Sequence, residues 1–219
     1  MFSRIRVVGL GRVGTAMQAR LQEQGLVVSD GEADLRLLCV PDDAIADVAR
    51  AQPVGAWIAH VSGATPLAAL APHARRFGLH PLQTIVRGRG PEQLDGAWAA
   101  IVGESTDALE AGTWLAGRLG LRPFPLADDR RAIYHAGCAL ASNYVVTLYR
   151  AASRALAAAG APPEALLPLI RRTIDNNFEL TGPVARGDWR TVDAHLDALR
   201  RELPDLEPLY RALVQATTR

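Results

Sequence analysis

Short apolar runs alternate with longer amphipathic segments along the first half of the chain. The short runs are rich in β-branched residues, which is typical of buried strands, and we expect strands over Arg4–Gly9, Leu26–Ser29, Leu35–Val40, Trp57–Val61, Ala97–Val102 and Arg122–Leu126. Helical periodicity predicts helices over Val13–Gln24, Pro41–Ala51, Pro66–Phe77 and Thr106–Leu119. Strands and helices in alternation favour a doubly wound, mostly parallel α/β sheet.

After Leu126 the strand pattern stops and only helical periodicity remains. We expect four helices there: Asp128 to about Ala159, Glu164–Asn177, an Asp188-capped helix to Glu202, and a last one from Pro204. The predicted domains are therefore an α/β domain over residues 1–126 and an all-helical domain over residues 127–219. No apolar stretch is long and unbroken enough for a membrane span, and no secretory signal is recognisable. We expect a cytoplasmic protein.

Composition narrows the chemistry. The formal net charge of the 219 residues is +1, so neither nucleic acid nor a membrane surface is an expected partner. All 24 basic residues are Arg, which excludes Schiff-base chemistry and lysine acid–base catalysis. The two cysteines are expected to be buried thiols. No set of His, Cys, Asp and Glu has metal-ligand spacing, so we expect no metal.

A glycine motif follows the first predicted strand. The residues Gly9-Leu10-Gly11-Arg12-Val13-Gly14 match G-x-G-x-x-G. In a strand–turn–helix setting the first glycine permits the turn, the second lets a pyrophosphate approach the backbone, and the third lets helix pack on strand. The motif predicts a dinucleotide site that uses all six residues. The alternative is a glycine turn kept for packing alone.

The adenosine side of this site is shortened. Asp30 stands at the distance expected for an acid that binds the adenosine ribose. Only residues 30–34 separate the second expected strand from the third, so the usual crossover helix is missing. Either the second run is no parallel strand or it pairs irregularly. Arg12 either meets the 2′-phosphate of NADP or is simply solvated, which leaves NADP or NAD as the cofactor.

Further candidate residues follow other strands, where ligands collect in such sheets. Val40, Pro41 and Ser62 are expected to contact cofactor. His80 is placed in a loop with Gln83 and Thr84, which suits catalysis and substrate binding, although a structural turn histidine is an equal alternative.

The long helix after Asp128 carries a second polar group. Offsets of seven and eight residues place His135, Ser142 and Asn143 on one side of that helix. We expect His135 and Asn143 to act in catalysis and Ser142 to bind substrate. Arg186, in a polar loop, either holds a substrate carboxylate or pairs with an acid.

Several phrases occur in a characteristic order along nearly the whole chain: G-L-G-R-V-G, V-P-D-D-A-I, H-x-S-G, H-P-L-Q-T, Y-H-A-x-x-x-x-x-S-N-Y, L-T-G-P-V-A-R-G-D and T-V-x-x-H-L (with H-x-S-G starting at His60). Together they resemble Rossmann-like oxidoreductases with a C-terminal helical domain of unknown function, related to 6-phosphogluconate dehydrogenase, ketopantoate reductase and pyrroline-carboxylate reductase. The resemblance implies an NAD(P)-binding domain, a cleft between domains and a homodimer formed through the helices. The chain differs from the better-known relatives at one position. Those relatives carry a Lys four residues before an Asn on the corresponding helix, and if that Asn matches Asn143, the position of the Lys is Ala139.

These observations favour an NAD(P)-dependent oxidoreductase that transfers hydride to or from a small carbonyl, hydroxyl or imine substrate. Without lysine, the proton donor is expected to be His80 or His135. The alternative is a catalytically inactive nucleotide-binding sensor or complex partner, and a deazaflavin cofactor is a third reading.

Overall fold

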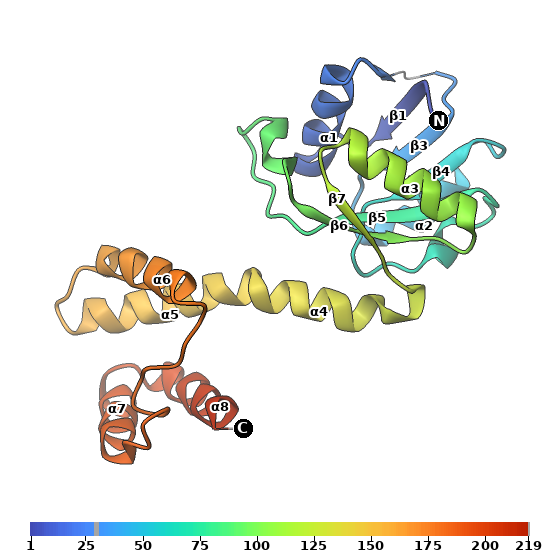
Figure 1. Cartoon of the computed structure of the whole chain (residues 1–219). Helices are drawn as coiled ribbons and strands as arrows, with labels where there is room; N and C mark the ends of the chain where they lie inside the picture. Colours follow the sequence, from blue (N-terminus) through green and yellow to red (C-terminus); the bar gives the residue numbers. More distant parts are fainter. Residues whose placement is uncertain (29–30, 219) are drawn as a thin grey trace. The chain divides into compact units, whose positions relative to one another are not determined.

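The computed structural model describes residues 1–28 and 31–218. The chain forms two compact units, Met1–Leu140 and Ala141–Arg219, and each is described by itself (Figure 1). The expected boundary at residue 126 coincides with the end of the last strand, whereas the units divide after Leu140. Helix α4 (Arg131–Ala141) thus lies almost wholly within the first unit.

The first unit is built on one sheet. In the described residues its strands are β1 (Arg4–Val8), β2 (Val27–Val28), β3 (Leu35–Leu38), β4 (Trp57–His60), β5 (Arg76–Pro81), β6 (Trp98–Val102) and β7 (Arg122–Pro125). They follow the order β2-β1-β3-β4-β5-β6-β7. Only β5 and β6 pair antiparallel, and every other neighbouring pair is parallel. The predicted doubly wound, mostly parallel sheet is confirmed.

No crossover helix lies among the described residues between β2 and β3, and the register of β2 shows why none is needed. Strand β2 pairs with β1 through Val27 and Val28 alone, opposite Arg4 and Ile5, while β3 begins opposite Ile5 on the other side of β1. Because β2 ends at the level where β3 starts, the chain does not need to return along the sheet, which is what normally requires a dozen residues. Asp34 secures the start of β3, since its carboxylate accepts hydrogen bonds from the backbone N–H of Ser3 and of Arg4, both at 2.8 Å.

Strand β5 corrects the sequence prediction. The expected helix over Pro66–Phe77 is wrong: the segment holds the short 3-10 helix η2 (Leu67–Leu70) and then the start of β5. Phe77 and Leu79 are both 0% exposed, so β5 is a largely buried interior strand, with Arg76 and His80 partly exposed. His80 consequently lies in a strand and not in a loop.

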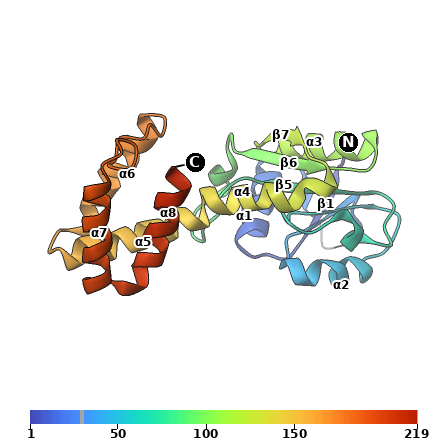
Figure 2. The same cartoon turned by 90° about the horizontal axis from the view of Figure 1, so that it is seen from below.

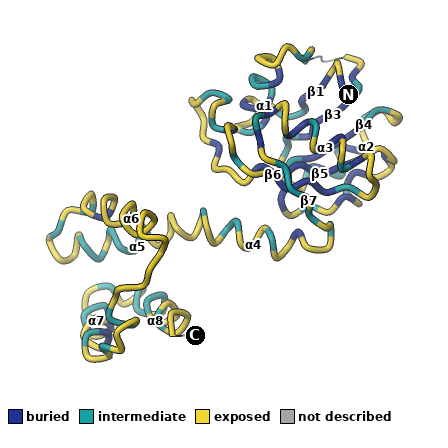
Figure 3. The backbone as a smooth tube through the Cα atoms, viewed as in Figure 1, coloured by how far each residue is buried: buried dark blue, intermediate teal, exposed yellow. Residues whose placement is uncertain are grey.

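Helices cover both faces of the sheet. Helices α1 (Arg12–Glu23) and α3 (Thr106–Arg118) share one core with Leu37, whereas α2 (Ile45–Arg50) and η2 share a second core with Leu38. Adjacent residues of a strand face opposite ways, so the two cores lie on opposite faces. Buried residues accordingly concentrate along the strands in Figure 3.

The second unit is all-helical. It contains α5 (Asn143–Ala158), α6 (Leu166–Asp175), α7 (Trp189–Glu202) and α8 (Glu207–Thr217) (Figure 2). The predicted single helix from Asp128 to Ala159 is wrong, because Ser142, with φ −125° and ψ −75°, interrupts it between α4 and α5. The predicted Asp188 cap is confirmed: its side chain accepts the backbone N–H of Thr191. No helix within residues 1–28 and 31–218 has the length and apolar character needed to cross a membrane.

Candidate functional site

The glycine loop joins β1 to α1 at the carboxyl edge of the sheet. Gly9 has φ +93°, and a Cβ there would lie 2.7 Å from the carbonyl oxygen of Cys39. A Cβ on Gly14 would lie 1.9 Å from the carbonyl oxygen of Gly9, so α1 packs directly on the turn. Both positions admit only glycine, for the reasons that the motif predicts.

The middle glycine differs from the other two. A Cβ on Gly11 would meet nothing within 4 Å, so its surroundings among the described residues are open. Gly11 is also the N-cap of α1, where no side chain caps the helix and the first turn carries no acid. At Gly11 the start of α1, which carries the positive end of the helix dipole, is therefore left uncovered. Asp30, the expected ribose ligand, lies outside the described residues.

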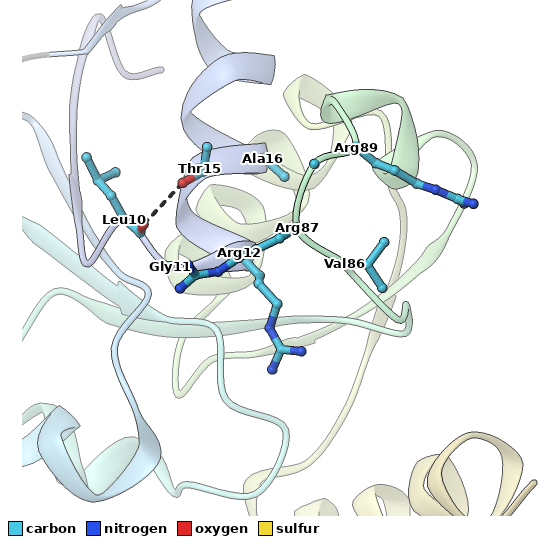
Figure 4. A pocket seen from close by; sticks show the side chains of 9 residues that line it. Leu10, Gly11, Arg12, Thr15, Ala16, Val86, Arg87 and Arg89 are labelled. Atoms are coloured by element: carbon cyan, nitrogen blue, oxygen red, sulfur yellow. Dashed lines mark hydrogen bonds between the residues drawn. The ribbon is translucent and has the colours of Figure 1, made fainter. Parts of the chain in front are cut away.

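A cavity of about 230 Å³ opens beside this helix start (Figure 4). Its lining comes from two segments far apart in the sequence: Leu10, Gly11, Arg12, Thr15 and Ala16 from the glycine loop and α1, and Val86, Arg87, Gly88 and Arg89 from the loop after β5. Three of these residues are Arg and none is acidic. The cavity suits an anionic ligand.

A second polar group follows β3 and β4 along the same edge. The Ser62 hydroxyl lies 2.8 Å from the Asp42 carboxylate and accepts the backbone N–H of Thr65 at 2.9 Å. This links the segment after β3, which contains Val40 and Pro41, to the segment after β4. Ser62 is thereby buried and held by its neighbours, while Pro41 is exposed.

Two histidines face each other next to Ser62. His80 Nδ1 and the Tyr134 hydroxyl are 2.7 Å apart, and the rings of His80 and His135 have their centroids 5.8 Å apart. Gly63 packs between the two rings: a Cβ there would lie 2.7 Å from His135 Cδ2 and 2.9 Å from His80 Nε2. The structure therefore brings His80 and His135 together, although they come from β5 and α4. Gln83 and Thr84, just after β5, are exposed.

A buried arginine lies behind this pair. Arg131, 3% exposed, donates to the Asp128 carboxylate at 2.6 Å and to the carbonyl oxygen of Ser62 at 3.0 Å. Its Nη2 is buried without a hydrogen-bond partner among the described residues. A Cβ on Gly78 would lie 2.2 Å from Nη2, so only glycine at that position of β5 leaves room for the guanidinium. Arg131 thus ties the start of α4 to the loop that contains Ser62.

This environment holds two histidines neutral. Burial lowers the pKa of His80 to about 4, with further lowering by the neighbouring His135 and Arg131. Burial also lowers the pKa of His60 to about 3, again aided by Arg131. Burial raises the pKa of Tyr134 well above its usual range. At neutral pH, His80 is an uncharged imidazole hydrogen-bonded to an uncharged phenol.

We expect acid to destabilise the fold through these histidines. An unfolded histidine takes up its proton near pH 6.5, whereas His60 and His80 stay neutral in the folded state down to about pH 3 and 4. The unfolded state therefore binds more protons below pH 6.5, and the free energy of unfolding falls by up to about 1.4 kcal/mol per pH unit for each histidine. Stability is fully retained above pH 6.5.

Urea unfolding at pH 7, 6 and 5 measures this slope. His60→Phe is the informative variant, because His60 is 0% exposed and both of its ring nitrogens lack a partner among the described residues. We expect the variant to lose part of the acid dependence. An unchanged slope would refute the assignment to His60.

The other predicted residues lie in the second unit. Asn143 is the exposed first residue of α5, Ser142 is at the helix break, and Arg186 is in the loop between α6 and α7, where its guanidinium donates to the carbonyl oxygen of Thr181. The predicted shared helix face of His135, Ser142 and Asn143 is wrong, because the helix does not continue through Ser142. Their expected roles stay predictions.

Sequence reasoning missed Arg131 and Asp42. Arg131 follows Asp128, Asp129 and Arg130 in a run that is typical of a solvated helix start. Nothing in that run indicates that one guanidinium is buried, since the burial depends on the distant Ser62 and Gly78. Asp42 had a weak signal, as a carboxylate directly after a strand at the ligand-binding edge.

The fold and this edge define a Rossmann-like α/β protein with a helical second unit. A family model described as "Domain of unknown function (DUF2520)" matches residues 97–217, which is more than half of the chain. The chain belongs to this family. No curated protein sequence matches it at a significant level.

Solved structures share the fold over almost the whole length. A Bacteroides fragilis protein, described provisionally as an NADP oxidoreductase, is 21% identical with a TM-score of 0.82, covering 99% of this chain and 98% of its own. A Thermotoga maritima protein is 21% identical with a TM-score of 0.77, covering 97% and 96%. A reductive aminase from Aspergillus terreus, in complex with NADPH and ethyl levulinate, is 18% identical with a TM-score of 0.68, covering 100% and 94%. At these identities the likeness establishes the fold alone.

Proposed function

We propose that the chain is an NAD(P)-dependent oxidoreductase acting on a small carbonyl, hydroxyl or imine compound. The observation that carries this proposal is the start of α1: Gly9 and Gly14 close the turn tightly, while Gly11 leaves the uncapped helix end open. A helix N-terminus of this kind receives the diphosphate of a dinucleotide.

The residues present fit that cofactor. The open space at Gly11 is a cradle that any side chain there would begin to fill, and the adjoining cavity is lined by arginines without an acid. The solved structures with this fold support the same cofactor class, since one is described provisionally as an NADP oxidoreductase and another contains NADPH. The backbone of Gly11, Arg12 and Val13 would hold the diphosphate.

The chemistry is assigned to the histidine pair. A bound nicotinamide supplies or takes up hydride, and the chain must move the accompanying proton. His80 is neutral at physiological pH, so its ring can take up the proton of a substrate hydroxyl as hydride leaves. Because its pKa is lowered to about 4, the protonated ring is a strong acid that gives the proton up again at once, to solvent or, in the reverse reaction, to the substrate. His135 is exposed beside it and exchanges that proton with solvent. The Tyr134 hydroxyl fixes the orientation of the His80 ring.

Other residues position the substrate and the cofactor. We assign Gln83 and Thr84, exposed just beyond His80, to the substrate, and Val40, Pro41 and Ser62 to the walls of the cofactor site. Arg131 and Asp42 hold the Ser62 loop from behind. Of the second unit, Ser142 and Arg186 stay proposed for substrate binding and Asn143 for catalysis.

Thermal unfolding in the presence of NAD, NADH, NADP and NADPH tests the proposal. A ligand at about 100 times its Kd stabilises the native state by about 2.7 kcal/mol, which raises Tm by roughly 5 °C or more in a chain of this size. We expect such a shift with at least one dinucleotide, and slow oxidation of its reduced form by a panel of keto acids or imines. No shift with any of the four would refute the proposal.

A catalytically inactive nucleotide sensor is the second candidate. The observation that favours it is the absence of lysine, which leaves Ala139 where related dehydrogenases carry their proton donor. A sensor would show the same rise in Tm but no oxidation of the reduced cofactor by any compound. Turnover, not binding, separates the two.

We also propose a homodimer formed through the second unit. Large apolar side chains are exposed there, among them Leu169 (62%), Phe178 (70%) and Leu180 (65%). A cavity of about 370 Å³ between α5, α7 and α8 is lined almost wholly by apolar side chains. Exposure of this extent is typical of an interaction surface.

A cytoplasmic location stays a prediction.

A further inference from the structure

The loop after β5 brings positive charge to the start of α1. Arg87 and Arg89 belong to this loop, and Arg12 belongs to the first turn of α1. All three are exposed and have no ion-pair or hydrogen-bond partner among the described residues, and the cavity between the two segments has no acid in its lining. In Figure 4 the side chains of Arg12 and Arg87 lie at the start of α1, whereas Arg89 points away from it.

The loop is held against α1. Gln93 bonds Val86 twice, since its carbonyl oxygen accepts the Val86 N–H at 2.9 Å and its amide donates to the Val86 carbonyl oxygen at 3.4 Å. Arg20 of α1 donates to the carbonyl oxygen of Pro91 at 2.9 Å and pairs with Asp95 at 2.6 Å. Arg87 therefore sits on a segment anchored to the same helix whose N-terminus it faces.

Unpaired guanidinium groups at such a place indicate a ligand with phosphate groups. Guanidinium–phosphate hydrogen bonds are charge-assisted and geometrically specific. Arg12 belongs to the glycine motif itself, whereas Arg87 lies in a segment more than seventy positions later in the sequence. Its presence there is not explained by packing, because it is exposed, or by an ion pair.

We propose that Arg87 is a phosphate-binding residue for the dinucleotide, so that the loop after β5 and the glycine loop hold the cofactor between them. The inference rests on the proposed function. A dinucleotide offers two sources of phosphate: the diphosphate, common to NAD(H) and NADP(H), and the 2′-phosphate, found only in NADP(H). The same guanidinium chemistry serves both.

Calorimetric titration of NADPH and NADH into the wild-type chain, Arg87→Gln and Arg87→Lys tests the proposal. Arg75→Gln is the matched control, because Arg75 is also exposed and unpaired among the described residues but precedes β5 at the opposite edge of the sheet. We expect Arg87→Gln to raise the Kd at least about tenfold, since a charge-assisted pair is being removed, and Arg87→Lys to raise it less. Arg75→Gln should match the wild type.

The two cofactors identify the phosphate. If Arg87→Gln loses affinity for NADPH and for the fragment 2′,5′-ADP but not for NADH, Arg87 binds the 2′-phosphate. If the variant loses affinity for NADPH and NADH equally, Arg87 binds the diphosphate. If Arg87→Gln binds both dinucleotides as Arg75→Gln does, the inference is overturned while the proposed function stands. If the wild-type chain binds neither, the proposed function itself has failed.

Discussion

Replacing Gly11 by Asp leaves the chain folded and weakens its binding of a nicotinamide dinucleotide by about 100-fold or more. Gly11 has φ −74° and ψ −162°, an extended conformation that aspartate adopts without strain, and a Cβ there meets nothing within 4 Å. As the N-cap of α1, an aspartate accepts a backbone N–H of the first turn and stabilises the helix by a few tenths of a kcal/mol. The same carboxylate then occupies and repels the place of the diphosphate.

Gly11→Asn is the matched control, since it has the same shape and capping ability without the charge. We expect both variants to unfold at or slightly above the wild-type temperature, and the Asp variant to bind far more weakly than the Asn variant in calorimetric titration. Equal affinities for Asp and Asn, or wild-type affinity in the Asp variant, would show that no anion binds at this helix end.

Replacing both His80 and His135 by Gln lowers turnover sharply while leaving dinucleotide affinity nearly intact. The two rings come together at the carboxyl edge of the sheet, with Gly63 between them. A positioned acid or base accelerates proton transfer by about 10²–10⁴-fold, so we expect a loss of that size in kcat. Gln keeps hydrogen-bonding ability but does not titrate.

His195→Gln is the control for this experiment. Its Nδ1 lies 2.7 Å from the Tyr210 hydroxyl, the same kind of contact that His80 makes with Tyr134, but it is on α7. Turnover of reduced cofactor with a keto acid or imine substrate should be unchanged in His195→Gln. Wild-type turnover in the double variant would remove the histidine pair from the mechanism, and a parallel loss of cofactor affinity would indicate a structural role.

Local patterns were sufficient to predict the strand, the glycine turn and the helix at the N-terminus. The glycine spacing, the apolar run of β1 and the periodicity of α1 all depend on residues close in sequence, and the structure has β1 at Arg4–Val8 and α1 at Arg12–Glu23. The sequence also predicts that no crossover helix follows the second strand, because a gap of a few residues is too short for one, and the described residues from 31 to 34 contain none.

Strand β5 was not predicted, because its sequence lacks the residue pattern that is typical of strands. Gly78 and Pro81 are both unfavourable inside strands, and the preceding apolar residues have helical spacing. Gly78 is explained only by the tertiary structure, since a side chain there would displace the guanidinium of Arg131. Gly78 therefore weakens the strand pattern in the sequence and, in the structure, makes room for the buried guanidinium of Arg131.

The chemistry of His80 likewise depends on contacts distant in sequence. The sequence supports a histidine with its ordinary pKa, ready to donate a proton. Burial within the sheet and the neighbouring Arg131 make it a neutral imidazole, with its pKa lowered to about 4. No local pattern could reveal this, because the neighbours come from α4, more than fifty positions later.

A crystal structure of the chain grown with NADPH tests the central claim most directly. We predict diphosphate density on the backbone N–H groups at the start of α1, over Gly11, with the guanidinium of Arg87 in contact with a phosphate group. The claim would be contradicted if crystals grown with saturating NADPH showed no density at the start of α1, or showed NADPH bound elsewhere on the chain.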